Sequence, residues 1–401
     1  MPDQPQQTVI VWLDPSQLPF VQAVAARARI RIVAAGSPAR ARSQELAEAL
    51  AATCVDDLRN TLISLSPAGG AGGPGAPPKD MPQSSADQCD LIWLASVERS
   101  TALEPAILDA VRACQDRGIT IVTSEPIPAA VLELGSSDDQ SGVLGPMTDS
   151  STADELDSAG PSSTWPALIP RFRAGKTMPD LTDSLEEFGS PRTIHFECFG
   201  LAVECSLGAR LMDAMDTIRS LVGEPEEMFA LHVPTLGLAR AAPSKSALDS
   251  LRDLGGTMSA IMRFSDGRSA SVLVSDAGGE WRRSLTLLGD PNHPKGGRLR
   301  ITDVSMEWIG SDGAVLERTR KRRSIGPISA PPLFTPASTL PTSSAIDVFA
   351  EALSQNGRRR AKSLPPMNHV GVLAMTGAIL LSARTGQAES PITIRRMVGA
   401  G

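Results

Sequence analysis

The chain has 401 residues, enough for two domains, because a single hydrophobic core seldom grows beyond roughly 250 to 300 residues. Its 41% hydrophobic and 21% charged residues are typical of a globular protein, and a formal charge of −7 excludes a sequence-wide basic field for nucleic acid. Two short basic runs, at 318–323 and 358–362, are interpreted as solvated faces rather than phosphate-binding sites.

The N-terminal residues lack the basic stretch and the small-residue cleavage site of a secretory signal, and no window approaches the roughly 20 apolar residues of a membrane span. We therefore expect a cytoplasmic protein with no membrane partner. An odd number of cysteines without a C-x-x-C pair argues against a disulfide framework, so we expect reduced thiols in or near the core. These residues are Cys54, Cys89, Cys114, Cys198 and Cys205.

The first part of the chain is predicted to alternate between strands and helices. The strands lie at 8–13, 29–36, 90–96 and within 118–126, and the helices at 19–28, 37–51 and 107–117, with another helical piece after a short link at 55–58. Ser37 is the expected N-cap of the second helix, with Pro38 at its first position. This alternation predicts a doubly wound, mostly parallel sheet of Rossmann type.

Two stretches are predicted to be flexible insertions because they cannot bury enough apolar surface to order themselves. One, at about 66–86, is rich in glycine and proline, and it does not pass from a strand into a helix as a phosphate-binding loop must. The other, at 135–164, is acidic. They place a first domain at 1–134 and a second at 165–401.

The second part is predicted to form an α+β domain with a large, mostly antiparallel open sheet. Its strand runs, separated by DG, GD or GG turns, lie at 192–201, 255–277, 281–290 and 297–320. A short helix at 181–189 precedes them, and an amphipathic helix at 209–225 follows the first. Two last helices, at 345–357 and 368–386, follow a proline-rich linker and are expected to return to the first domain.

Landmarks along the whole chain, apart from the insertions, resemble the Gfo/Idh/MocA family of glucose-fructose oxidoreductase and inositol dehydrogenase. They include RIRIVAAGSP (29–38), DLIWLAS (90–96), GITIVTSEP (118–126), PRFRAG (170–175), LVGEP (221–225) and WIGSDG (308–313). The resemblance implies an NAD(P)-binding Rossmann domain, a substrate among sugars, inositols and similar polyols, and homo- or hetero-oligomers formed through the open sheet.

The cofactor positions that the resemblance implies carry unexpected residues. The glycine motif G-x-G-x-x-G/A, which lets the backbone approach a pyrophosphate, is replaced by Trp12, Asp14 and Gln17. The acidic residue that would bind ribose falls at Ala35 or Gly36. The bulk of Trp12 at the first position and the negative charge of Asp14 at the second disfavour binding of a phosphate group. The remaining cofactor positions, at the tips of two strands, are Ser96 and Pro126.

The catalytic positions that the resemblance implies are also altered. The E-K-P lysine is replaced by Glu125, and the D-x-x-x-H-x-x-D pattern keeps only Asp216, with Asp213 at the histidine position and Ala209 at the first aspartate. Glu125 and Asp213 are a possible new carboxylate pair across the cleft, for acid/base work or for a cation. Neutral drift of two polar residues is the interpretation we favour.

Other patterns of catalytic chemistry find no support. No G-x-S-x-G motif is present, and the histidines are isolated, without metal-ligand spacing, so we expect surface or capping roles and no metal site. They are His195, His232, His293 and His369. The turn-rich loop at 291–297 combines a histidine with a lysine, but a ligand there is not favoured.

Two functions follow as hypotheses. The favoured one is a non-catalytic protein that holds a sugar-like ligand or a partner subunit and binds no nicotinamide cofactor. The alternative is an active NAD- or NADP-dependent oxidoreductase with an atypical site, since hydride transfer needs a positioned nicotinamide and an acid/base group.

Overall fold

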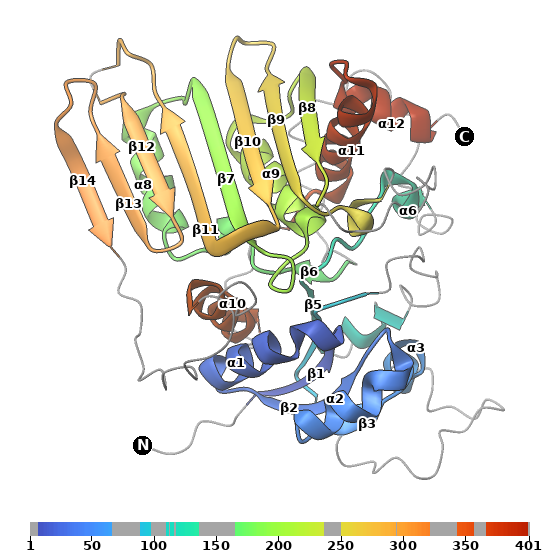
Figure 1. Ribbon diagram of the computed structural model, residues 1–401. Coiled ribbons are helices and arrows are strands. Elements are labelled where there is room, and N and C mark those ends of the chain that lie inside the picture. The colour runs from blue at the N-terminus through green and yellow to red at the C-terminus, as the bar shows by residue number, and fades with distance from the viewer. Residues whose placement is uncertain are drawn as a thin grey trace.

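The chain folds into two sheets that stand one above the other, each with its own helices (Figure 1). The computed structural model describes residues 7–65, 89–97, 110–111, 113–115, 118–135, 165–235, 250–293, 295–320, 343–356 and 366–399. Outside these ranges lie the insertion predicted at 66–86, nearly all of that predicted at 135–164, parts of the helix predicted at 107–117, most of the linker, and the basic run at 358–362.

The first sheet has six strands in the order β3-β2-β1-β4-β5-β6, and every neighbouring pair is parallel. This order is typical of Rossmann folds and confirms the predicted doubly wound sheet. Four strands are mainly apolar or β-branched runs that the sequence pattern predicted, and β2 is the least buried of the four. The other two, β3 and β6, were missed because two or three residues are too few to show a period. The strands are β1 Thr8–Trp12, β2 Arg31–Gly36, β3 Thr53–Val55, β4 Leu91–Leu94, β5 Thr120–Thr123 and β6 Ala167–Leu168.

The helices of this sheet are short. They are α1 Leu18–Ala28, preceded by the 3-10 turn η1 at Pro15–Gln17, α2 Ser43–Ala49, preceded by η2 at Arg40–Arg42, α3 Leu58–Leu65 and α6 Val131–Gly135. The expected N-cap at Ser37 is wrong, because α2 begins six residues later, at Ser43. The Ser37 hydroxyl instead accepts a hydrogen bond from the N–H of Ala39, which closes a local turn.

The second sheet has eight strands in the order β14-β13-β12-β11-β7-β10-β9-β8. Only β7 and β10 pair in parallel; all other pairs are antiparallel, which confirms a mostly antiparallel sheet. The sequence analysis missed β8. The strands are β7 Thr193–Leu201, β8 Glu227–Val233, β9 Thr257–Arg263, β10 Ser269–Ser275, β11 Ala277–Leu288, β12 Arg298–Thr302, β13 Ser305–Ile309 and β14 Val315–Arg320.

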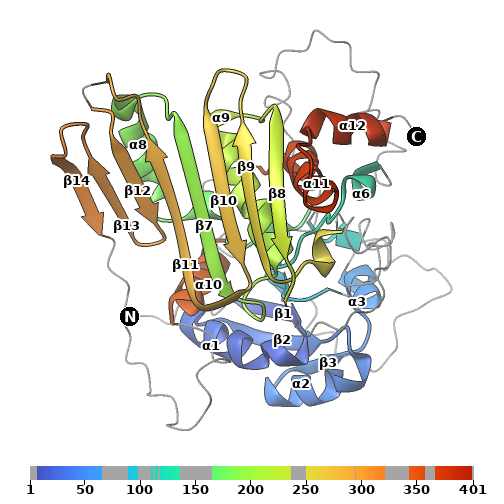
Figure 2. The same ribbon diagram turned by 45° about the horizontal axis from the view of Figure 1, so that its top comes forward.

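Two helices, α8 at Met178–Phe188 and α9 at Leu207–Val222, pack on one face of this sheet (Figures 1 and 2). Burial alternates along the strands, so every second side chain points into the core beneath these helices. Among the described elements, no helix covers the opposite face. Two 3-10 turns, η4 at Phe172–Ala174 and η5 at Leu251–Asp253, lie near α9. The sheet is therefore open on one side.

The edge strand β8 is protected by the end of the chain. Helix α11, His369–Thr385, lies beside β8, and α12, Pro391–Gly399, packs on α11. The Ala230 N–H donates to the Ser382 hydroxyl at 3.0 Å, and Met228 forms a bridge with Glu389. These bonds use backbone groups that an exposed edge would offer to another strand. None of the described helices is long and apolar enough to cross a lipid bilayer.

The five cysteines are free thiols, and four of them are buried, as expected for reduced core residues. Only Cys54 is partly exposed. Burial raises the pKa of the Cys54 and Cys89 thiols to about 11. These thiols are therefore protonated near neutral pH and are poor nucleophiles.

An aromatic cluster joins the two sheets. Helix α10, Ser343–Asn356, packs against α1 and carries Phe349, whose ring lies 4.9 Å from Phe20, 6.3 Å from Trp93 and 5.7 Å from Trp281, centroid to centroid. These partners belong to α1, β4 and β11 respectively. Phe349 therefore contacts both sheets at once, and its ring is buried.

We predict that Phe349→Ala lowers the free energy of unfolding by about 3 to 5 kcal/mol, because it removes a buried ring at the junction and leaves a cavity. Urea denaturation followed by tryptophan fluorescence measures this loss. The matched control is Leu288→Ala, which truncates a side chain that is 44% exposed and should cost little. Equal losses in the two variants would contradict the role given to the cluster.

Candidate functional site

The candidate site lies where the carboxyl ends of β1, β2, β4 and β5 face the second domain. In a doubly wound sheet this crevice is where ligands bind. The sheet order brings most of the predicted cofactor positions together there: Trp12 ends β1, Gly36 ends β2, Ser96 follows β4 and Pro126 follows β5. The Ser96 N–H donates to the Trp12 carbonyl at 3.1 Å, which ties two of these strand ends together.

Trp12 fills the space beside Gly36. A Cβ atom added to Gly36 would lie 2.3 Å from the Trp12 ring and 2.3 Å from the Val55 carbonyl oxygen, so only glycine fits between them. The indole is buried and packs with the apolar residues of the sheet around Ile10 and Val55. The absent side chain at 36 thus makes room for a tryptophan of the same chain.

The turn after β1 is closed by its own side chains. The Asp14 carboxylate accepts hydrogen bonds from the Ser16 N–H at 2.9 Å and the Ser16 hydroxyl at 2.6 Å. The Gln17 side-chain oxygen accepts from the Asp14 N–H at 3.0 Å, which completes a capping box. Pro15, at the first position of the turn, has no N–H to offer.

Gln17 also joins this turn to the rest of the molecule. Its side-chain nitrogen donates to the Ala95 carbonyl at 3.0 Å and to the Val203 carbonyl, in the second domain, at 3.4 Å. A glycine motif leaves the N–H groups of such a turn free for a pyrophosphate. Here a carboxylate stands beside them and bonds one of them, so the residues at this turn do not fit a dinucleotide held in that way.

Glu125 lies half-buried just beyond β5. Its N–H donates to the Thr123 hydroxyl at 3.0 Å, and that hydroxyl donates to the Glu125 carbonyl at 2.9 Å. The preceding Ser124 accepts from the Trp93 indole at 2.8 Å and contacts Cys205, just before α9, through its carbonyl. The strand tip is thus fixed against the start of α9.

Asp213, on α9, is held in a buried ion pair. One of its oxygens accepts from the Phe172 N–H at 2.7 Å, and the other lies 3.0 Å from the Arg283 guanidinium. Arg283 also pairs with Asp303 at 2.6 Å and donates to the Pro170 carbonyl at 2.8 Å. Burial raises the pKa of Asp213 to about 6, although the Arg283 charge and the Phe172 N–H favour its charged form.

Asp216 lies one helical turn further along α9 and is 2% exposed. Arg171 contacts one of its oxygens at 2.7 Å and Arg173 the other at 3.0 Å. Both oxygens are therefore held by guanidinium groups from the segment around η4. Ala209, at the position of the first aspartate of the pattern, is buried in the core.

The acid/base positions are thus bound to arginines of the chain. The two Asp213 oxygens bond with Phe172 and Arg283. The pairing of Glu125 with Asp213 across the cleft stays a prediction. Within the described ranges, no group of three or more His, Cys, Asp or Glu side chains is placed to hold a metal ion.

The expected surface or capping role is wrong for one histidine. His369 is only 9% exposed and lies 6.1 Å from the Trp165 ring, centroid to centroid. Burial, reinforced by the nearby Arg171, lowers its pKa to about 4, so the ring is neutral near pH 7. By contrast, His293 is exposed and His195 is partly exposed.

Sequence reasoning missed the arginines that hold the two α9 carboxylates. A signal existed for Arg283, because it shares the inward-facing alternation of β11 with Trp281 and Leu285, where a charged residue needs a buried partner. Arg171 and Arg173 lie in the PRFRAG landmark, but nothing in that segment indicates which carboxylate they meet.

Comparison with known proteins identifies the fold. No family model matches the sequence, and no curated protein matches it. Solved structures do match. A myo-inositol dehydrogenase from Corynebacterium glutamicum is 15% identical with a TM-score of 0.52, covering 96% of this chain and 98% of its own. An oxidoreductase from Pseudomonas syringae is 13% identical with a TM-score of 0.57, covering 97% and 99%.

A myo-inositol dehydrogenase from Lactobacillus casei, solved with NAD(H) and myo-inositol, is 13% identical with a TM-score of 0.53 and covers 96% of each chain. At such low identity these matches establish the fold alone. The chain has the two-domain fold of the Gfo/Idh/MocA oxidoreductases, which confirms the resemblance found in the sequence.

The raised pKa of Asp213 predicts a pH dependence. A carboxyl group with a higher pKa in the folded chain contributes stability that is complete below its unfolded pKa of about 4 and is lost as the pH rises through about 6. We expect the free energy of unfolding of the wild type, minus that of Asp213→Asn, to fall on the order of 2 to 3 kcal/mol between pH 4 and 7.

Urea titrations of both proteins at several pH values measure this difference, in which His369 and the other titrating groups cancel. A difference that stays constant from pH 4 to 7 would show that Asp213 has an ordinary pKa in the folded protein.

Proposed function

We propose that this chain, with its Gfo/Idh/MocA fold, is a non-catalytic protein that acts by holding a partner subunit on its open sheet. The single observation that carries the proposal is the closed turn after β1, where Asp14 and Gln17 cap the backbone themselves. A pyrophosphate would have to displace a carboxylate and then approach a buried indole. Nicotinamide binding in the usual position is therefore disfavoured by both charge and bulk.

The state of the α9 carboxylates supports the same proposal. Hydride transfer to or from an alcohol needs a group that exchanges the hydroxyl proton. Asp213 is 3% exposed and bonded through both oxygens, and Asp216 lies between two arginines. Removing a partner from such a buried pair is costly, which favours a structural role for these ion pairs.

The second candidate is an NAD- or NADP-dependent oxidoreductase acting on a sugar, inositol or similar polyol. One observation favours it: the pKa of Asp213 is about 6, in the range that suits acid/base catalysis near neutral pH. A fold shared with a dehydrogenase solved with NAD(H) supports it further. In this candidate Asp213 exchanges the proton and Glu125 lies beside the substrate.

We predict that neither NADH nor NADPH stabilises the protein in a thermal-shift assay up to millimolar concentration. A ligand that binds the folded state at 100 times its Kd contributes roughly 2.7 kcal/mol, which shifts the melting temperature measurably. The control is a dehydrogenase of this fold treated identically.

A saturable shift with either nucleotide would contradict the non-catalytic proposal and favour the second candidate. That candidate further requires turnover of a polyol such as myo-inositol with NAD or NADP, and loss of turnover in Asp213→Asn.

The open sheet offers a surface for the partner. Four large apolar side chains, here called the apolar strip, lie on its uncovered face: Phe229, Leu231 and Val233 of β8 are 39%, 59% and 65% exposed, and Ile261 of β9 is 61% exposed. Phe229 and Ile261 are directly opposite each other in the ladder. Exposed apolar clusters of this kind mark interaction sites. A second copy of the chain, with the same strip, is the partner that we propose.

We predict that the double change Leu231→Glu with Ile261→Glu converts an oligomer into a monomer, because it places two charges in an apolar contact. Light scattering coupled to size-exclusion chromatography measures the mass. Leu316→Glu, on β14 at the other end of the sheet and 46% exposed, is the matched control. A wild type that is already monomeric at micromolar concentration would contradict the proposed homo-oligomer.

A further inference from the structure

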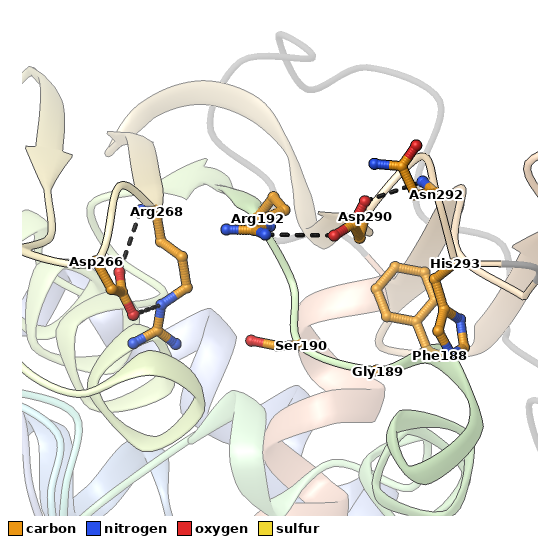
Figure 3. A pocket seen from close by; sticks show the side chains of 9 residues that line it. All are labelled: Phe188, Gly189, Ser190, Arg192, Asp266, Arg268, Asp290, Asn292 and His293. Carbon is orange, nitrogen blue, oxygen red and sulfur yellow. Dashed lines mark hydrogen bonds and ion pairs between the residues drawn. The ribbon is translucent and has the colours of Figure 1, made fainter.

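A pocket of about 420 Å³ lies at the opposite end of the second sheet from the first domain. It is formed by the end of α8, the segment leading into β7, the β9–β10 turn and the β11–β12 turn (Figure 3). Its volume is within the range of small-molecule sites, roughly 300 to 1,000 Å³. The sequence analysis did not favour a ligand near the β11–β12 turn, which contributes His293 to this pocket.

The pocket is rich in hydrogen-bond donors for which the described part of the chain supplies few acceptors. Arg192 has five side-chain N–H groups, and among the residues that the structure describes it makes one side-chain bond, to Asp290 at 3.3 Å. Arg268 pairs with Asp266 and donates one bond to the Val222 carbonyl, at the end of α9. In Figure 3 the two guanidinium groups and the Ser190 hydroxyl lie around the same part of the pocket.

The two carboxylates of the pocket, by contrast, are already engaged. Asp266 accepts from the Arg268 backbone N–H at 3.2 Å and faces its guanidinium with the other oxygen. Asp290 accepts from the Asn292 N–H at 2.9 Å and from Arg192. These bonds lower the pKa of both carboxyl groups, so both stay ionised and fix the turns and the arginines in place.

The arginines of the pocket have spare hydrogen-bond donors, whereas its carboxylates are engaged. This combination favours a ligand that supplies hydrogen-bond acceptors. Guanidinium groups match the geometry of carboxylate and phosphate oxygens, which accept two parallel N–H bonds. Each hydroxyl of a neutral polyol would also bring a donor, which the two engaged carboxylates are less able to accept. The apolar side of the pocket, formed by Phe188, can contact the remainder of a small ligand.

We propose that this pocket binds the oxyanion group, phosphate or carboxylate, of a small ligand, with Arg192 as its main contact and Arg268 and Ser190 as supporting donors. The site is independent of the crevice of the first domain and of any nicotinamide. Because the pocket is remote from the turn after β1, the closure of that turn by Asp14 and Gln17 does not prevent a ligand from binding here.

Isothermal titration of the full-length protein tests this proposal with four probes: inorganic phosphate, glucose 6-phosphate, gluconate and uncharged glucose. Binding of phosphate and glucose 6-phosphate identifies a phosphate site, and binding of gluconate a carboxylate site. Arg192→Ala should lower the affinity for the anion at least about tenfold, because it removes a charge-assisted bidentate contact. Ser190→Asp should lower the anion affinity similarly, because it adds a negative charge to the pocket while Arg192 itself is unchanged.

The matched control is Arg298→Ala. Arg298 is an arginine of the same sheet that is 47% exposed and ion-paired at 3.2 Å, against 55% and 3.3 Å for Arg192, but it lies outside the pocket. Its removal should leave the anion affinity unchanged. The proposal is overturned if no anion binds at millimolar concentration, if glucose binds as tightly as the anions, or if Arg192→Ala binds like the wild type.

Discussion

The backbone N–H groups at the first turn after β1 need partners, because helix termini leave them without intrahelical bonds. In this chain Asp14 and Gln17 supply them, and Gln17 continues to the carbonyls of Ala95 and Val203. One capping box thus closes the turn and links the two domains. Beside this turn, the Trp12 ring packs against Gly36.

In the interior of the second domain, too, buried polar groups are paired with side chains of the same chain. Asp213 and Asp216 on α9 are buried, and their burial is tolerated because arginines of β11 and of the segment around η4 contact them. Asp213 shows the balance most clearly: desolvation raises its pKa while Arg283 opposes the rise. Ion pairs of this kind fix the helix against the sheet, whose other face no helix among the described elements covers.

The sequence predicted the architecture well, because apolar runs, helix stops and turn residues are local signals. Short elements such as β6 left no such signal, and Ser37 was misjudged because its hydroxyl bonds within a turn. The contacts of the candidate site were harder to predict from the sequence. Substituted motif positions could be recognised one by one, but the bonds of Gln17 to two carbonyls and the burial of His369 arise from residues far apart in the sequence. Such contacts depend on tertiary packing, which a periodic pattern does not encode.

If the protein is non-catalytic, as we propose, the chain's own side chains at the turn after β1 exclude a dinucleotide phosphate. A crystal structure determined in the presence of millimolar NADH tests it most directly. The account predicts that the Asp14 carboxylate remains bonded to the Ser16 N–H, that Trp12 stays against Gly36, and that no nucleotide density is found beside them. A pyrophosphate at the start of α1, with the capping box opened and the indole displaced, would contradict it.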